Sequence, residues 1–210
     1  MPVGWLVFDM MGVIFKESDD VENLLIPYIQ KINPEISKEK ISDLYLKASV
    51  GEISAFRFWK SLGFGGEYPE IEKTYLEESF EVTSGFKDTV LKLSNSYQLA
   101  VLSNEVGQWN SYLRKKFELN RFFEDIIISS EVGFRKPDKR VYEKLLKAIQ
   151  APPESCVFVD DRLENLRPAS DLGIKTVWFS KGNSGLDYSP DYELDNLNNL
   201  QEALEVFENA

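Results

Sequence analysis

Polar residues that can carry out hydrolytic chemistry follow directly after short apolar runs at several points of the chain. They are Asp9, Ser103, Asn104, Asp160 and Asp161. The sequence contains no histidine, which excludes Ser-His-Asp and Cys-His catalysis and the usual zinc sites with histidine ligands. Carboxylate, hydroxyl or lysine chemistry remains, together with a metal ion that prefers oxygen ligands. Taken singly, each of these residues is also an ordinary turn or cap residue.

The runs that precede these residues have the length and composition of buried parallel strands. They cover residues 3–8, 99–102, 126–128, 157–159 and 176–179. Helical patterns lie between them, as in the apolar set Val141, Leu145, Ala148 and Ile149 after Pro137. This alternation predicts an α/β fold with a parallel sheet. Because ligands bind at the carboxyl ends of the strands in such sheets, the polar residues are expected to share one edge.

The interval between about residues 16 and 83 breaks this alternation and contains helical patterns only. Ser37 and Ser54 are candidate N-caps of two of these helices. The apolar residues expected in the interior of this region are Ile41, Leu44, Tyr45, Ala48, Phe56, Phe58 and Trp59. We therefore expect a helical cap at residues 16–83, inserted into a core formed by residues 1–15 and 84–210. A last helix is expected to begin near Asn199.

The composition limits the partners and the compartment. A formal charge of −11 and an isoelectric point near 4.7 argue against nucleic acid and anionic membranes, which bind basic surfaces. No apolar run approaches the length of a transmembrane helix, and we expect no secretory leader, because the residues before the first strand contain no basic n-region or small-residue cleavage site. The single cysteine, Cys156, is interpreted as buried packing and fits a reducing environment. We expect a cytoplasmic monomer or homodimer.

The run Asp9-Met10-Met11-Gly12 resembles motif I of the haloacid dehalogenase (HAD) superfamily, whose usual form is Asp-x-Asp-Gly. Residues 102–104, 133–138 and 159–165 resemble motifs II, III and IV of the same superfamily. The helical insert matches the position of the family's type-1 cap. The resemblance covers nearly the whole chain, and it implies a Rossmann-like core, hydrolase activity and a place in the phosphatase-like branch.

The resemblance also implies a nucleophile and a metal site. Asp9 is the expected nucleophile, which would form an aspartyl phosphate. The expected ligands of Mg²⁺ are the Asp9 carboxylate, the backbone carbonyl of Met11 and the Asp161 carboxylate, with Asp160 alongside.

The resemblance implies phosphate-binding residues as well. Lys136 would supply positive charge to the phosphoryl oxygens and to Asp9. Ser103 and the backbone of Asn104 would donate hydrogen bonds to the same oxygens. Arg57 and Lys60 are candidates for a second anion site in the cap, although a solvated helix face is the more common role of such residues.

Met11 is the serious departure from the family pattern, because the second Asp of motif I protonates the leaving group in the family's phosphatases. A thioether cannot do this, and general acid–base catalysis contributes roughly 10²–10⁴-fold. The sequence leaves open whether Glu17, Asp19, Asp20 or a cap residue takes over this role.

The leading hypothesis is a Mg²⁺-dependent phosphatase for a small phosphorylated metabolite, such as a sugar phosphate. A haloacid dehalogenase is one alternative, since dehalogenases of the superfamily also lack the second Asp. Without a metal, however, the pair Asp160-Asp161 would place uncompensated charge near the nucleophile. A weakened family member that binds or regulates without turnover is the other alternative, and Met11 is its only support.

Overall fold

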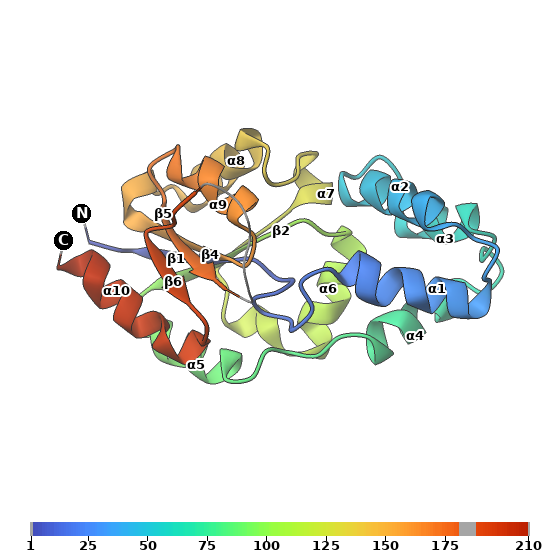
Figure 1. The fold of residues 1–210 in the computed structure, drawn as a ribbon, viewed down its shortest axis with the longest axis horizontal. Coiled ribbons are helices and arrows are strands. Elements are labelled where there is room, and N and C mark those ends of the chain that lie inside the picture. The colour runs from blue at the N-terminus through green and yellow to red at the C-terminus, as the bar shows by residue number, and fades with distance from the viewer. Residues whose placement is uncertain (1, 181–187, 210) are drawn as a thin grey trace.

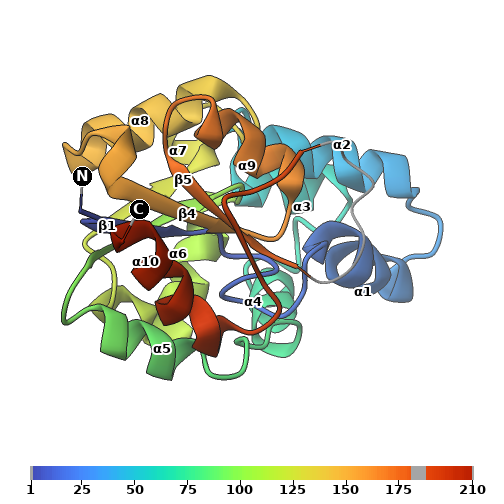
Figure 2. The same ribbon diagram turned by 60° about the vertical axis from the view of Figure 1, so that its left-hand side comes forward.

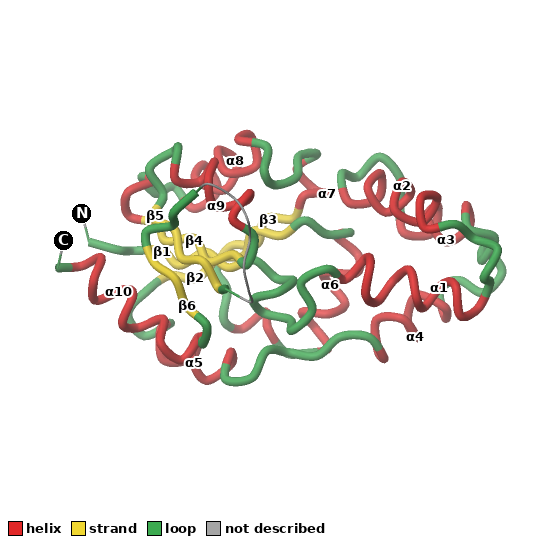
Figure 3. Tube along the Cα trace, in the orientation of Figure 1, coloured by secondary structure: helices red, strands yellow, loops and turns green. Residues whose placement is uncertain are grey.

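A parallel sheet of six strands forms the centre of the described chain, in the order β3-β2-β1-β4-β5-β6 (Figures 1 and 3). The computed structural model describes residues 2–180 and 188–209. The strands are β1 (Trp5–Phe8), β2 (Gln98–Ser103), β3 (Asp125–Ile128), β4 (Cys156–Asp160), β5 (Lys175–Phe179) and β6 (Tyr192–Leu194). The predicted α/β fold with a Rossmann-like parallel sheet is confirmed.

Helices cover both faces of this sheet, because successive side chains of a strand point to opposite faces. In the fully buried strand β1, Leu6 and Phe8 pack in one apolar cluster, and Trp5 and Val7 in another. The first cluster includes α5 (Phe86–Leu93), α6 (Gly107–Lys116) and α10 (Leu200–Glu208), and the second includes α8 (Lys139–Ile149) and α9 (Leu163–Ser170). Figures 1 and 2 show these two helical layers on either side of the strands. Short helical segments complete this part: η2 (Leu119–Arg121), α7 (Ser129–Val132), η3 (Pro153–Ser155) and η4 (Leu197–Asn199).

Two elements of the core differ from the sequence analysis. Strand β6 was not expected, because it has only three residues and just one of them, Leu194, is buried. It forms through pairing with β5 rather than through a pattern of its own. On α8, Val141 and Leu145 are buried as predicted, whereas Ala148 is exposed. Cys156 is a buried free cysteine at the start of β4, as predicted.

The remaining helices gather at one end of the molecule, on the right in Figure 1. They are η1 (Val21–Leu25), α1 (Ile26–Ile32), α2 (Lys38–Ser49), α3 (Ala55–Ser61) and α4 (Glu70–Glu78). The predicted N-caps are confirmed, because Ser37 Oγ accepts from the α2 backbone and Ser54 Oγ accepts from the α3 backbone. None of the helices in the described ranges is long and apolar enough to cross a membrane.

The interior of this helical part is aromatic. Phe58 and Trp59 are fully buried, as expected, but Phe56 is 42% exposed, so its assignment to the interior was wrong. The Phe56 ring lies at the surface against Tyr68, with ring centroids 5.3 Å apart. On α3, Phe58 and Trp59 are on the buried face of the helix and Phe56 is not. The run of aromatic residues in the sequence did not distinguish these positions.

The chain enters and leaves the helical part through two segments that lie side by side. Phe15 and Val82 form an antiparallel bridge, and the Thr83 amide donates to the Ile14 carbonyl at 2.9 Å. We propose that these paired segments mark the limits of the cap at residues 16–83, with the core formed by residues 1–15 and 84–210.

Candidate active site

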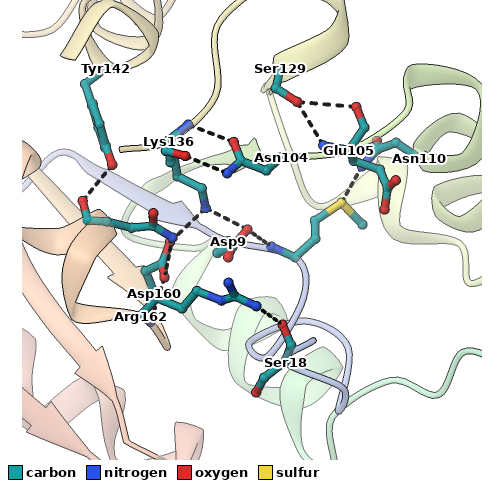
Figure 4. A network of polar contacts seen from close by, with 12 residues as sticks. Asp9, Ser18, Asn104, Glu105, Asn110, Ser129, Lys136, Tyr142, Asp160 and Arg162 are labelled. Carbon is teal, nitrogen blue, oxygen red and sulfur yellow. Dashed lines mark hydrogen bonds and ion pairs between the residues drawn. The ribbon is translucent and has the colours of Figure 1, made fainter. Parts of the chain in front are cut away.

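The sheet brings three of the predicted polar positions together, because β2, β1 and β4 are neighbours and run in the same direction. Asp9 follows β1, Ser103 ends β2, and Asp160 ends β4. Lys136 reaches the same place from the loop between α7 and α8. Figure 4 shows its side chain extending to Asp9 and to the end of β4.

Lys136 lies at the centre of the site. Its Nζ atom is 2.7 Å from Asp9 Oδ1 and 2.7 Å from Asp160 Oδ2, and the residue is only 4% exposed. Burial works to lower the pKa of Lys136, but attraction by Asp160 and Asp9 outweighs it and holds the pKa above its ordinary value. The ammonium group is therefore charged and ion-paired to both carboxylates (Figure 4).

Asp9 is buried, and its Oδ1 atom also accepts a hydrogen bond from the Met10 amide at 2.6 Å. Burial raises the pKa of Asp9 to about 8; Lys136 counteracts this, while Asp160 and Asp161 add to it. Burial likewise raises the pKa of Asp161 to about 6. The single positive charge of Lys136 therefore does not balance the negative charges of the three neighbouring carboxylates.

The three carboxylates are arranged as a cation site requires. One oxygen each of Asp9, Asp160 and Asp161 lies within 4.8 Å of the others. Within the described residues, the buried Oδ1 atom of Asp161 has no hydrogen-bond partner. Gly12 stands against this carboxylate at φ +80°, and a Cβ atom there would overlap it. Clustered carboxylate oxygens are the ligands that Mg²⁺ prefers, so the residues present fit such an ion.

Asp160 differs from the other two carboxylates because both of its oxygens are already engaged. Oδ1 accepts from the Arg162 amide at 2.8 Å, and Oδ2 accepts from Lys136. The Asn165 amide group lies 3.1 and 3.0 Å from the same two oxygens. Asp160 therefore holds Lys136 in position.

Ser103 and Asn104 are used differently. The Ser103 Oγ atom is buried and, among the residues that the structure describes, has no hydrogen-bond partner. The Asn104 side chain instead bonds to the backbone of Lys136. Ser103 thus retains a donor for a ligand, whereas the Asn104 side chain secures the lysine.

A cavity of about 400 Å³ opens beside these residues. Asp9, Ser103 and Lys136 line it from the sheet side, and Tyr45 and Leu46 line it from α2. The site thus lies between the sheet and the helical part, which explains how the helices can contact a substrate.

Apart from the predicted Lys136, the cationic residues that line this cavity differ from those considered for a second anion site. Arg57 and Lys60 are exposed on α3 and are not among the described residues that line the cavity, which agrees with the solvated helix face expected as their more common role. Arg135 and Arg162 line the cavity instead. Their only signal in the sequence is adjacency, since each directly neighbours a predicted site residue.

Met11 lines the cavity and is 6% exposed. Of the carboxylates considered as its replacement, Asp19 and Asp20 also line the cavity. Glu17 is not among the described residues that line the cavity, and its side chain accepts hydrogen bonds from Asn23 and from the Asp19 amide.

Comparisons with known proteins agree with the four motifs. The family model described as haloacid dehalogenase-like hydrolase matches residues 6–179. The glyceraldehyde 3-phosphate phosphatase of Pyrococcus furiosus is 35% identical over 147 residues, which is 66% of this chain and 59% of that protein. The chain therefore spans about three fifths of the length of this relative.

Solved structures share the fold. A 2-haloacid dehalogenase from Pseudomonas syringae aligns with a TM-score of 0.72 at 16% identity, covering 98% of this chain and 99% of that one. The HAD family enzyme bt-2542 from Bacteroides thetaiotaomicron, in complex with magnesium and inorganic phosphate, aligns with a TM-score of 0.67 at 22% identity, covering 89% and 98%. Because the family model spans most of the chain, including every strand-end residue of the site, this protein belongs to the haloacid dehalogenase-like hydrolases, as its motifs predicted.

Proposed function

We propose that this protein is a Mg²⁺-dependent phosphatase that hydrolyses a small phosphorylated metabolite, such as a sugar phosphate, with Asp9 as the nucleophile. One observation carries the proposal. The Lys136 ammonium group lies between Asp9 and Asp160 at 2.7 Å from each, while Asp161 beside them has an oxygen without a partner among the described residues. This arrangement combines a nucleophile, a fixed cation and the ligands of a second cation.

The carboxylates of Asp9 and Asp161 and the main-chain carbonyl of Met11 would hold Mg²⁺. When bound, the ion would neutralise the excess charge of the carboxylates and attract the phosphoryl oxygens of the substrate. The methionine at position 11, where the family motif has its second aspartate, leaves this metal ligand unchanged, because the ligand is the main-chain carbonyl. Asp160 belongs to the same cluster and acts mainly on Lys136.

The protein's own residues account for the transfer. A carboxylate oxygen of Asp9 attacks the phosphorus, and the bond between phosphorus and the leaving oxygen breaks. Water then attacks the phosphorus of the aspartyl phosphate, the bond to Asp9 breaks, and inorganic phosphate and the free carboxylate remain. Lys136 and the Ser103 hydroxyl stabilise the charge on the phosphoryl oxygens during both steps.

The relatives support the substrate class. The relative from Pyrococcus furiosus is named glyceraldehyde 3-phosphate phosphatase. The substrate in that name is a small sugar phosphate. A cavity of about 400 Å³ has the size of a small-molecule site. A buried single cysteine accords with a cytoplasmic protein.

The dehalogenase alternative is less compatible with the site. A dehalogenase needs no metal, and three carboxylates with a single paired lysine would then leave uncompensated buried charge. The regulatory alternative gives no reason for the ion pairs of Lys136 with Asp9 and Asp160, or for the Asp161 oxygen that has no partner among the described residues.

The test measures hydrolysis of p-nitrophenyl phosphate with Mg²⁺, with excess chelator, and after Mg²⁺ is restored. We expect activity only when Mg²⁺ is present. Asp9→Asn should lose turnover and retain the fold, because the side chain changes little in volume. Asp43→Asn is the matched control, since Asp43 is exposed on α2 and outside the described lining of the cavity.

Full activity in chelator would contradict the metal assignment. More than a few per cent of residual activity in Asp9→Asn would contradict the nucleophile. Binding of phosphate esters without turnover would favour the regulatory alternative.

A further inference from the structure

Asp20 is a buried aspartate in the wall of the active-site cavity. It lines the same cavity as Asp9 and Met11, and it is only 6% exposed. It stands at the N-cap position of η1, but its side chain makes no capping hydrogen bond. In the described part of the chain, its Oδ2 atom is buried and has no hydrogen-bond partner. A capping role therefore does not explain this residue.

The surroundings of Asp20 allow it to hold a proton near neutral pH. The charged and titratable groups that act on it or respond to it are Asp19, Tyr45, Tyr75, Glu105, Arg135 and Arg162. Burial raises the pKa of Asp20 to about 7, the charge of Asp19 adds to this, and Arg162 and Arg135 counteract it. An acid–base catalyst works best when its pKa is near the working pH.

The site needs such a group, because the residue at position 11 is methionine and has no proton to donate or accept. On the basis of the phosphatase activity proposed above, we propose that Asp20 is the general acid and base of this site and replaces the function that Met11 cannot perform.

The proton balance closes over both steps. As Asp9 attacks the phosphorus and the ester bond breaks, the leaving oxygen takes the proton of the Asp20 carboxyl group and departs as an alcohol. The Asp20 carboxylate then takes a proton from the water that attacks the aspartyl phosphate. Inorganic phosphate leaves, and the Asp9 carboxylate and the protonated Asp20 are restored.

The other carboxylates near the cavity are less suitable. Asp19 has a side chain that is 45% exposed and lies 3.6 Å from Arg162. Glu164 lines the cavity but is exposed. Glu105 is buried and its Oε2 atom, like Asp20 Oδ2, has no hydrogen-bond partner among the described residues, but Glu105 is not among the described residues that line the cavity.

The experiment compares Asp20→Asn with the wild type on two substrates, a primary alkyl phosphate and p-nitrophenyl phosphate. The readout is kcat/KM, which reports the steps up to formation of the aspartyl phosphate. We expect kcat/KM for the alkyl ester to fall by roughly 10²–10⁴-fold, the contribution of a positioned acid. The aryl ester should change little, because nitrophenolate leaves without a proton. Asp43→Asn should change neither, and Met11→Asp combined with Asp20→Asn should restore the alkyl ester.

An equal loss on both esters, or no loss on the alkyl ester, would overturn the role of Asp20 while leaving the phosphatase activity intact. Absence of any Mg²⁺-dependent turnover in the wild type would overturn both proposals. If Asp20→Asn does not fold, the pH dependence of the wild type decides. Relative to the aryl ester, kcat/KM for the alkyl ester should fall as the pH rises through about 7, and parallel profiles would overturn the proposal.

Discussion

Asn104 and Lys136 hold each other through a reciprocal pair of hydrogen bonds. The Lys136 amide donates to Asn104 Oδ1 at 2.8 Å, and Asn104 Nδ2 donates to the Lys136 carbonyl at 2.9 Å. The loop that carries the lysine is thereby attached to the end of β2, next to the nucleophile (Figure 4). The direction of the Lys136 side chain therefore depends on a residue 32 positions away in sequence.

Asn104→Ala should consequently affect stability and activity together. An unsatisfied buried backbone group costs about 1–3 kcal/mol, so we expect a decrease of this size in the free energy of unfolding, measured with denaturant. The value of kcat/KM should fall because Lys136 is no longer held. Asn95→Ala is the control, since Asn95 is exposed and, among the described residues, its side chain bonds to the carbonyls of Leu91 and Lys92 in the preceding helix α5. Unchanged stability in Asn104→Ala would contradict this reading.

Ser103→Ala should separate function from stability. The Ser103 hydroxyl has no partner in the described structure, so its removal should leave the free energy of unfolding unchanged or slightly higher, while KM for the phosphate ester rises. Ser129→Ala is the comparison, because Ser129 Oγ accepts from the Glu105 amide and donates to the Ser49 carbonyl. That variant should lose stability. If Ser103→Ala lost as much stability as Ser129→Ala, the ligand-binding role would be wrong.

Gly12→Ala should weaken the binding of Mg²⁺, because a Cβ atom at this position would overlap the Asp161 carboxylate. The measurements are the Mg²⁺ concentration for half-maximal activity and the rise of Tm on addition of Mg²⁺. Gly63→Ala is the matched control, since Gly63 also has a positive φ, of 99°, but a Cβ atom there meets nothing within 4 Å. Backbone strain at a positive φ should lower the free energy of unfolding of both variants. Only Gly12→Ala should change the Mg²⁺ concentration for half-maximal activity and the rise of Tm with Mg²⁺.

Asp20→Asn should become more stable relative to the wild type as the pH rises. The pKa of Asp20 is about 7 in the folded protein and 3.8 as its ordinary value, so the folded state binds the extra proton between these values. Its contribution to stability is fully present below 3.8 and is lost as the pH rises through 7, and asparagine removes this loss. The free energy of unfolding of Asp20→Asn minus that of the wild type should therefore increase over that interval and stay constant above about 7. A constant difference would show that Asp20 is ionised throughout.

The sequence by itself determined five of the six described strands and the place of the site. The apolar runs that end at Asp9, Ser103 and Asp160 are long enough to form buried strands, and parallel strands end at one edge of a sheet. The position of Lys136 ahead of a helix, within a run that resembles a known motif, was also readable from the chain. These features depend on local patterns of apolar residues and on the alternation of strands and helices, from which a parallel sheet follows.

Only the tertiary structure decided which polar groups became buried and which remained in solvent. The sequence offered Asp20 only as one of several candidate acids and assigned no role to Glu105, yet both residues are buried in the structure. Arg57 and Lys60 were candidates for a second anion site, yet they are exposed and outside the described lining of the cavity, which includes Arg135 and Arg162. The physical reason is that burial, pKa and hydrogen-bond satisfaction arise from contacts between segments far apart in sequence, and no local pattern records those contacts.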